Sequence, residues 1–221
     1  MTYTTLNSYL KDRFGCKVYK IALDGGFTCP NRDGTVGTDG CIFCSKGGSG
    51  DFAESREKSI SEQIADGKKR VSKKIKDGKY IAYFQAFTNT YAPVDRLREL
   101  YTEAMSQPDI AALSIGTRPD CLGEDVLALL DEMNKRVPVF VELGLQTIHE
   151  DTARYIRRGY DLSVYDKAVA DLHKIGVNVV THLIIGLPGE SKEDMLRSVE
   201  YVCKMTDGIK LQLLHILRGT D

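Results

Sequence analysis

Short apolar runs alternate with longer amphipathic stretches along the whole chain. The apolar runs are rich in β-branched and aromatic residues and predict strands at residues 19–23, 81–87, 111–115, 139–143, 177–185 and 209–214. Between them, apolar positions recurring every three or four residues predict helices at 59–76, 94–105, 123–135, 150–157, 163–175 and 192–205, with Asp151 and Ser191 as early caps. This alternation is typical of βα units that close a parallel sheet.

Polar and glycine-rich segments follow the predicted strands, as in "TNTYAP", "GTRPD", "GLQTIHE" and "GLPGES". Active sites of barrel proteins are built from such βα loops. Six strands suit an incomplete barrel better than a closed barrel of eight, so the predicted fold class is α/β, a partial (β/α)6 TIM-type barrel of parallel strands. No repeat or linker divides residues 1–221, which predicts a single domain. The chain stops directly after the sixth predicted strand, so we expect a further C-terminal segment.

Composition excludes recruitment of nucleic acid or membrane by overall charge. The 221 residues are 42% hydrophobic, enough for one sizeable core, and 30 basic against 31 acidic residues give a net charge of -1. A polyanion would therefore be bound by a local patch. No run approaches the roughly 18 apolar residues of a membrane span, and the N-terminus lacks the apolar core of a signal peptide. These features predict a cytoplasmic protein with no membrane partner.

Three of the six cysteines lie in one glycine-rich segment, "CPNRDGTVGTDGCIFC". Cys41 and Cys44 form a C-x2-C pair, and Cys29 can supply a third ligand to the same centre. Three thiolates leave one iron of a 4Fe-4S cluster open. The alternative is a zinc knuckle completed by a histidine or by Cys16. Spacing alone leaves both possibilities open.

This segment, with Phe43 inside the C-x2-C pair, is followed in order by "VELGLQT" and "LIIGLPGES". Together these motifs resemble the radical S-adenosylmethionine (SAM) superfamily. More narrowly they resemble its YhcC/YtqA-like branch, whose long cysteine spacing is similar to that of the Elp3 tRNA-modifying enzymes. The resemblance runs from about residue 19 to residue 220.

The resemblance implies a 4Fe-4S cluster on Cys29, Cys41 and Cys44, with SAM bound to the fourth iron. It implies a reducing electron donor such as flavodoxin or ferredoxin, and reductive cleavage of SAM to a 5'-deoxyadenosyl radical that takes hydrogen from the substrate. The protein would then supply binding, orientation and exclusion of water.

Residues that follow the predicted strands are the candidate SAM contacts. They are Phe43, Thr88, Asn89, Thr117, Glu142, Gln146, Arg158, His182 and Leu214. Alternation in "VELGLQT" places Glu142 and Gln146 on one face, where a polar ligand would satisfy them.

Several of these candidates have a structural alternative. Thr88 and Asn89 occupy the position at which most members carry a "GGE"-like edge, so the chain departs from the family there. Thr117 can instead cap a turn, Arg158 can be a solvated charge at a helix end, and His182 can be a structural residue beside a strand.

The substrate is the least defined part of the prediction. "KKRVSKKIKDGK", residues 68–79, has seven basic residues and one acid, and on a helix it forms either a phosphate-binding patch or a solvated face. The resemblance implies modification of wobble uridine in tRNA, in which a carboxymethylaminomethyl group becomes aminomethyl. Two alternatives stay open: a radical SAM enzyme acting on a small molecule or protein, and a noncatalytic zinc-binding RNA adaptor.

Overall fold

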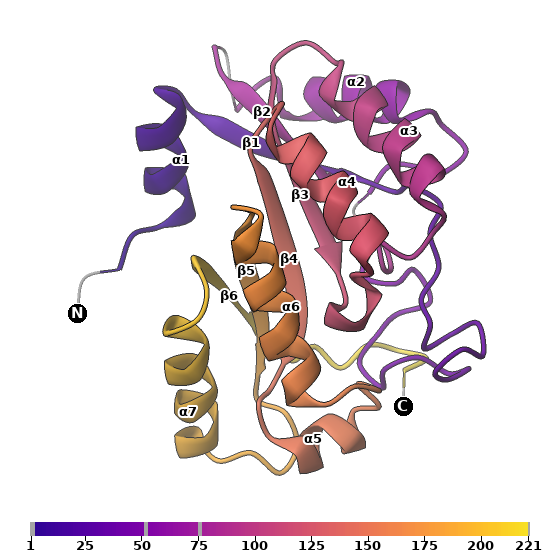
Figure 1. Ribbon diagram of the computed structural model, residues 1–221, viewed down its shortest axis with the longest axis vertical. Helices are drawn as coiled ribbons and strands as arrows, with labels where there is room; N and C mark the ends of the chain where they lie inside the picture. The colour runs from indigo at the N-terminus through magenta and orange to yellow at the C-terminus, as the bar shows by residue number, and fades with distance from the viewer. Residues whose placement is uncertain (1–2, 51–52, 75–76, 221) are drawn as a thin grey trace.

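The computed structural model describes residues 3–50, 53–74 and 77–220. These residues form one sheet of six parallel strands, in which each strand pairs with the next along the chain. The strands are β1 (Val18–Leu23), β2 (Lys79–Phe84), β3 (Ile110–Thr117), β4 (Val139–Gln146), β5 (Asn178–Ile185) and β6 (Gly208–Leu213). The predicted α/β fold, a half barrel of six parallel strands, is confirmed (Figure 1).

The helices follow the sheet in the expected order. They are α1 (Leu6–Phe14), α2 (Ile60–Val71), α3 (Val94–Met105), α4 (Glu124–Asn134), α5 (Glu150–Tyr155), α6 (Leu162–Lys174) and α7 (Lys192–Cys203), with a short 3-10 helix η1 (Pro119–Cys121). The sequence pattern predicts neither α1 nor η1. Helix α1 buries only Leu10, so it lacks the repeating apolar face on which such a prediction depends.

Two predicted helix ends differ from the structure. The helix predicted at 59–76 ends at Val71, where the Ser72 hydroxyl donates to the carbonyl oxygen of Lys69 and competes with the helical pattern; residues 75–76 lie outside the described residues. The N-cap of α5 is His149, and Asp151 lies within the first turn. Ser191 is confirmed as the N-cap of α7, with a reciprocal capping box to Asp194.

The two faces of the curved sheet bury different kinds of side chain. One face packs against the helices through residues such as Leu23, Phe84, Ile115, Val141 and Leu183, which are fully buried. Helix α2 approaches β1 closely: a Cβ atom added at Gly67 would lie 2.4 Å from the Ile21 side chain. The helices therefore fix the curvature of the sheet from outside.

The concave face of the sheet carries apolar side chains at the amino ends of the strands and polar side chains further along them. Val18, Ile81, Ala112 and Phe140 form an apolar cluster there, covered by Leu10 of α1. Above this cluster lies a polar layer, which we define as Lys20, Tyr83, Ser114, Glu142, His182 and Lys210. Because strand side chains alternate, the residues between these positions point to the other face and pack against the helices.

None of the helices in residues 3–50, 53–74 and 77–220 is both long and apolar enough to cross a membrane.

Candidate functional site

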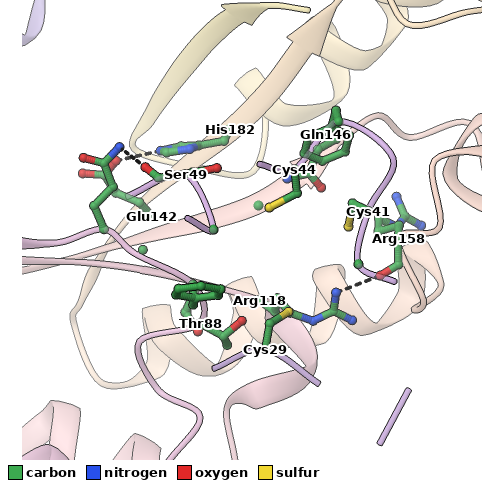
Figure 2. Close-up of a pocket in the computed structure, with 18 of the residues that line it drawn as sticks. Cys29, Cys41, Cys44, Ser49, Thr88, Arg118, Glu142, Gln146, Arg158 and His182 are labelled. Atoms are coloured by element: carbon green, nitrogen blue, oxygen red, sulfur yellow. Dashed lines mark hydrogen bonds and ion pairs between the residues drawn. The ribbon is translucent and has the colours of Figure 1, made fainter. Parts of the chain in front are cut away.

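The cysteine loop, residues 28–50, connects β1 to α2 and borders a cavity at the carboxyl ends of the strands. Cys29, Cys41 and Cys44 line this cofactor cavity from the loop. Residues from the other strands line it from below, namely Tyr83, Gly116, Thr117, Glu142, Gly144, Gln146, His182, Ile184, Lys210 and Gln212. Figure 2 shows the three cysteine side chains set around one space, with Glu142 and His182 to one side.

Side chains of the cysteine loop hold its shape. The Asn31 amide donates to the carbonyl oxygen of Arg157, 2.6 Å away, and to the Cys41 sulfur at 3.3 Å. The Arg32 guanidinium donates to the carbonyl oxygens of Cys44 and Ser45, at 3.1 and 2.6 Å. These bonds fix both ends of the C-x2-C pair.

The three cysteines are free thiols, and their chemistry fits an iron–sulfur cluster. Burial raises the pKa of the Cys41 thiol to about 11, and the neighbouring Cys44 and Cys29 act in the same direction. A cationic centre would reverse this effect by stabilising the thiolates. Within the described residues, no three His, Cys, Asp or Glu side chains are grouped to hold a single metal ion. In a 4Fe-4S cluster each cysteine thiolate binds a different iron, so the three sulfur atoms need not meet around a single ion.

The end of β4 departs from regular strand geometry inside the cavity. Gln146 has a φ of +66°, and the pairing with β5 shifts register between Gly144 and Gln146. Its amide nitrogen lies 2.9 Å from the carbonyl oxygens of both Gly144 and Leu145, an orientation assigned because the opposite one sets oxygen against oxygen. Ser49 and Phe87, which also line the cavity, have φ values of 66° and 62°. Left-handed backbone at non-glycine residues clusters at binding sites.

The carboxylate of Glu142 is the centre of the polar layer. It accepts hydrogen bonds from Lys20 and Ser114, and from His182 Nε2 at 2.7 Å. Burial alone would raise the pKa of Glu142, but His182 and Lys20 together hold it well below the ordinary glutamate value. Burial also lowers the pKa of His182, which the bond to Glu142 only partly opposes. At neutral pH Glu142 is therefore ionised and accepts the hydrogen bond from His182 Nε2–H.

Most of the residues predicted from sequence come together in this cavity. Its lining includes Cys29, Cys41, Phe43, Cys44, Thr88, Thr117, Glu142, Gln146, Arg158 and His182. Thr117 also shares a hydrogen bond with Thr90, 2.6 Å away, so its hydroxyl already has a partner.

Two predicted SAM contacts, Asn89 and Leu214, lie outside the cavity lining. The Asn89 side chain is fully buried and its amide donates to the Gly116 carbonyl oxygen at 2.7 Å, which braces the floor of the cavity from below. Leu214 packs against the apolar cluster of Ile156, Ile184 and Leu187. The prediction for Asn89 and Leu214 used only their place after a strand, and that place does not determine the direction in which the side chain points.

Arg158 lines the cavity, so its predicted SAM contact stays a prediction, but the alternative from its sequence context is wrong. It is 1% exposed, which excludes a solvated helix-end charge. Its guanidinium donates to the carbonyl oxygens of Tyr160 and Thr147, at 2.9 and 2.7 Å, and pairs with Glu150 at 3.2 Å. Arg158 therefore joins the end of β4 to the loop before α6.

Sequence reasoning missed several cavity residues, of which Arg118 is the most buried charge. Its guanidinium forms two hydrogen bonds to Asp120, at 2.9 and 2.7 Å. A third goes to the Arg158 carbonyl oxygen, as Figure 2 shows. It lies 5.0 Å from the centre of the Tyr160 ring. Tyr83 and Lys210 were also missed. Their signal was the period-two alternation within β2 and β6, which places them on the concave face.

Comparison with known proteins identifies the family. The model of the radical SAM superfamily matches residues 29–202. The uncharacterized protein YtqA of Bacillus subtilis is 52% identical over 219 residues, and the protein YhcC of Escherichia coli strain K12 is 45% identical over 213 residues. These alignments cover 99% and 96% of this chain, and 68% of each relative.

More distant similarities cover smaller shares of larger proteins. A tRNA uridine(34) acetyltransferase of Methanocaldococcus jannaschii is 38% identical over 114 residues, which is 50% of this chain and 20% of that protein. The solved structure of Elp3 from Methanocaldococcus infernus superposes with a TM-score of 0.66 at 19% identity, over 92% of this chain and 47% of that one. The chain thus spans about half of that Elp3 structure. By the matching family model and these relatives, the chain belongs to the YhcC/YtqA-like branch of the radical SAM superfamily.

Proposed function

We propose that this radical SAM enzyme modifies the wobble uridine of tRNA by converting a carboxymethylaminomethyl group to aminomethyl. The observation that carries the enzymatic part is the cofactor cavity, where three thiols from one loop face the carboxyl ends of the barrel strands. The partial similarity to proteins named tRNA uridine(34) acetyltransferase supports the choice of tRNA.

Cys29, Cys41 and Cys44 would hold a 4Fe-4S cluster, and the strand ends around Gln146 would hold SAM. When bound, the cluster and SAM together supply the one-electron chemistry that removes a hydrogen atom from the substrate. The chain contributes by positioning. Asn31 donates to the Cys41 sulfur, and Arg32 holds the backbone of Cys44, so the ligand loop is organised by hydrogen bonds.

The basic segment at residues 68–79 gives the tRNA proposal little support. The Lys68 ammonium donates to the Pro108 carbonyl oxygen and pairs with Asp109 at 3.4 Å. Lys69 pairs with Asp66 at 3.0 Å, although its side chain remains 78% exposed. Lys68 and Lys69 thus already have acidic partners, and the tRNA proposal therefore rests on the partial similarity.

Replacing Gln146 by alanine should weaken SAM binding by up to about tenfold, the effect of one lost hydrogen bond. Alanine is as strained as glutamine at a φ of +66°, so the backbone is expected to keep its shape. Titration calorimetry with SAM on the iron-loaded protein measures the change. Iron content should stay at the wild-type level, and Gln107→Ala, in the loop between α3 and β3 and outside the cavity lining, is the matched control. Unchanged SAM affinity would remove Gln146 from the site.

The test of the substrate is mass spectrometry of tRNA nucleosides. Cells lacking the protein should accumulate 5-carboxymethylaminomethyluridine and lose 5-aminomethyluridine, because the conversion between them is blocked. The wild-type gene should restore the ratio, whereas a Cys41→Ala gene should not. An unchanged ratio in the deletion strain would rule out this reaction and favour a small-molecule or protein substrate.

A further inference from the structure

The polar layer carries an excess of positive charge. Lys20 and Lys210 contribute two ammonium groups, and Glu142 contributes the single carboxylate. Burial holds the pKa of Tyr83 well above its ordinary value, with the Glu142 charge acting in the same direction, so the phenol is neutral. Within the polar layer, two ammonium groups therefore face one carboxylate, and one positive charge has no matching negative charge. The Asp207 carboxylate also lines the space beside Lys210, but it accepts from the Val179 amide at 2.8 Å and is bonded to His173 at 3.1 Å.

Lys210 is the ammonium with no hydrogen-bonded carboxylate. Burial lowers the pKa of Lys210, and the charge of Glu142 only partly opposes this shift. Glu142 is fully buried and is already bonded by Lys20, Ser114 and His182. Lys210 lies opposite His182 in the strand register, and its ammonium is 5.7 Å from the centre of the Tyr83 ring. None of the other residues that the structure describes forms a hydrogen bond or ion pair with it. A partly buried charge in this state is stabilised when a ligand supplies the missing anion.

The position of Lys210 also gives it access to two cavities. It lines the cofactor cavity beneath the cysteine loop. It also lines a second cavity at the open side of the barrel, between β1, β6 and α1, whose lining includes Leu6, Tyr9, Lys20, Phe140, Val180 and Ile209. Tyr83, Glu142 and Lys210 border both cavities. A molecule bound inside the barrel can therefore contact Lys210 and the cofactor cavity at the same time.

We infer that Lys210 binds a carboxylate group of the substrate inside the barrel, between the cofactor cavity and its open side. A carboxylate carries the single negative charge that balances the polar layer, whereas a phosphate dianion would leave an excess of negative charge. The ammonium would donate charge-assisted hydrogen bonds to the carboxylate oxygens. The assignment of this group as the carboxymethyl carboxylate of the modified uridine rests on the proposed function; the carboxylate site itself does not.

Calorimetric titration of the iron-loaded protein with sarcosine tests this inference, because sarcosine is the carboxymethylaminomethyl group with a hydrogen atom in place of the uracil ring. Sarcosine should bind to the wild type, and Lys210→Gln should weaken its binding by about tenfold or more, since a charged hydrogen bond is lost. Lys192→Gln, on the exposed first turn of α7, should bind sarcosine as the wild type does. Methylamine, which lacks the carboxylate, should not bind.

Three results would overturn the inference: no sarcosine binding to the wild type, equal binding to Lys210→Gln, or tighter binding of inorganic phosphate than of sarcosine. Circular dichroism of each variant shows whether lost binding reflects lost folding, in which case Lys210→Met is titrated instead. The test is independent of tRNA. Sarcosine binding that depends on Lys210, combined with unchanged tRNA nucleosides, would retain the carboxylate site and reject the wobble-uridine substrate. If the tRNA nucleosides change in the deletion strain but sarcosine binding does not depend on Lys210, the carboxylate site is rejected and the wobble-uridine substrate is retained.

Discussion

Alanine at Cys29, Cys41 or Cys44 should abolish assembly of a 4Fe-4S cluster. Each thiolate would bind a separate iron, and no fourth cysteine of the described residues lines the cavity. Cys121 lines a different cavity with Thr90 and Tyr91. Anaerobic reconstitution of the wild type should give about four irons and four acid-labile sulfides per chain. Iron and sulfide analysis of the three variants should show near-complete loss.

Cys203→Ala is the matched control, because Cys203 is exposed at the end of α7 and should not affect the iron content. An intact cluster in Cys41→Ala would contradict the ligand assignment. About one zinc and no sulfide in the wild type would instead support the zinc-binding adaptor, in which four ligands surround one ion.

The second large effect is expected from Glu142→Gln, which should lower the free energy of unfolding by about 3 kcal/mol. The Glu142 side chain is 0% exposed, and its charge offsets that of Lys20, which is 27% exposed. Glutamine keeps the shape but leaves two ammonium groups with no carboxylate between them. The expected loss lies at the lower end of the range for breaking a buried ion pair, because Lys20 reaches water. Urea unfolding at neutral pH measures the difference.

The same substitution should change how stability depends on pH. The pKa of Glu142 is lower in the folded protein than its ordinary value of 4.5, so the unfolded chain binds the proton more readily. Its contribution is therefore complete above about pH 4.5 and is lost as the pH falls toward the folded-state value. Wild type and Glu142→Gln should differ most near neutral pH and converge in acid. A constant difference down to pH 3 would show that the Glu142 charge does not stabilise the fold.

A double variant separates the charge effect from the loss of packing. Lys20→Met removes the partner ammonium, so adding Glu142→Gln to it should cost less than Glu142→Gln alone. Additive costs would mean that the ion pair is not the source of the stability.

Local pattern was enough to predict the architecture. Period-two and helical periodicities are properties of neighbouring residues, and they located six strands, six of the helices and the Ser191 cap. The cysteine spacing and the two later motifs were likewise readable from the chain, and they led to the radical SAM family that the comparisons then showed. Alternation in β4 also placed Glu142 and Gln146 together on the concave face.

The tertiary structure decided which polar side chains have partners. The Asn89 amide donates to the Gly116 carbonyl oxygen beneath the cavity. The Arg158 guanidinium donates to the carbonyl oxygens of Thr147, just after β4, and of Tyr160, in the loop before α6. Helix α1 was not predicted because Leu10 is its one buried side chain, and Phe14, only partly buried, packs on the same apolar cluster. The excess charge at Lys210 arises because β1, β4, β5 and β6 bring their side chains to one place. Sequence fixes each side chain's type and its face of a strand, whereas contacts between residues far apart in the chain exist only once the sheet has curved around them.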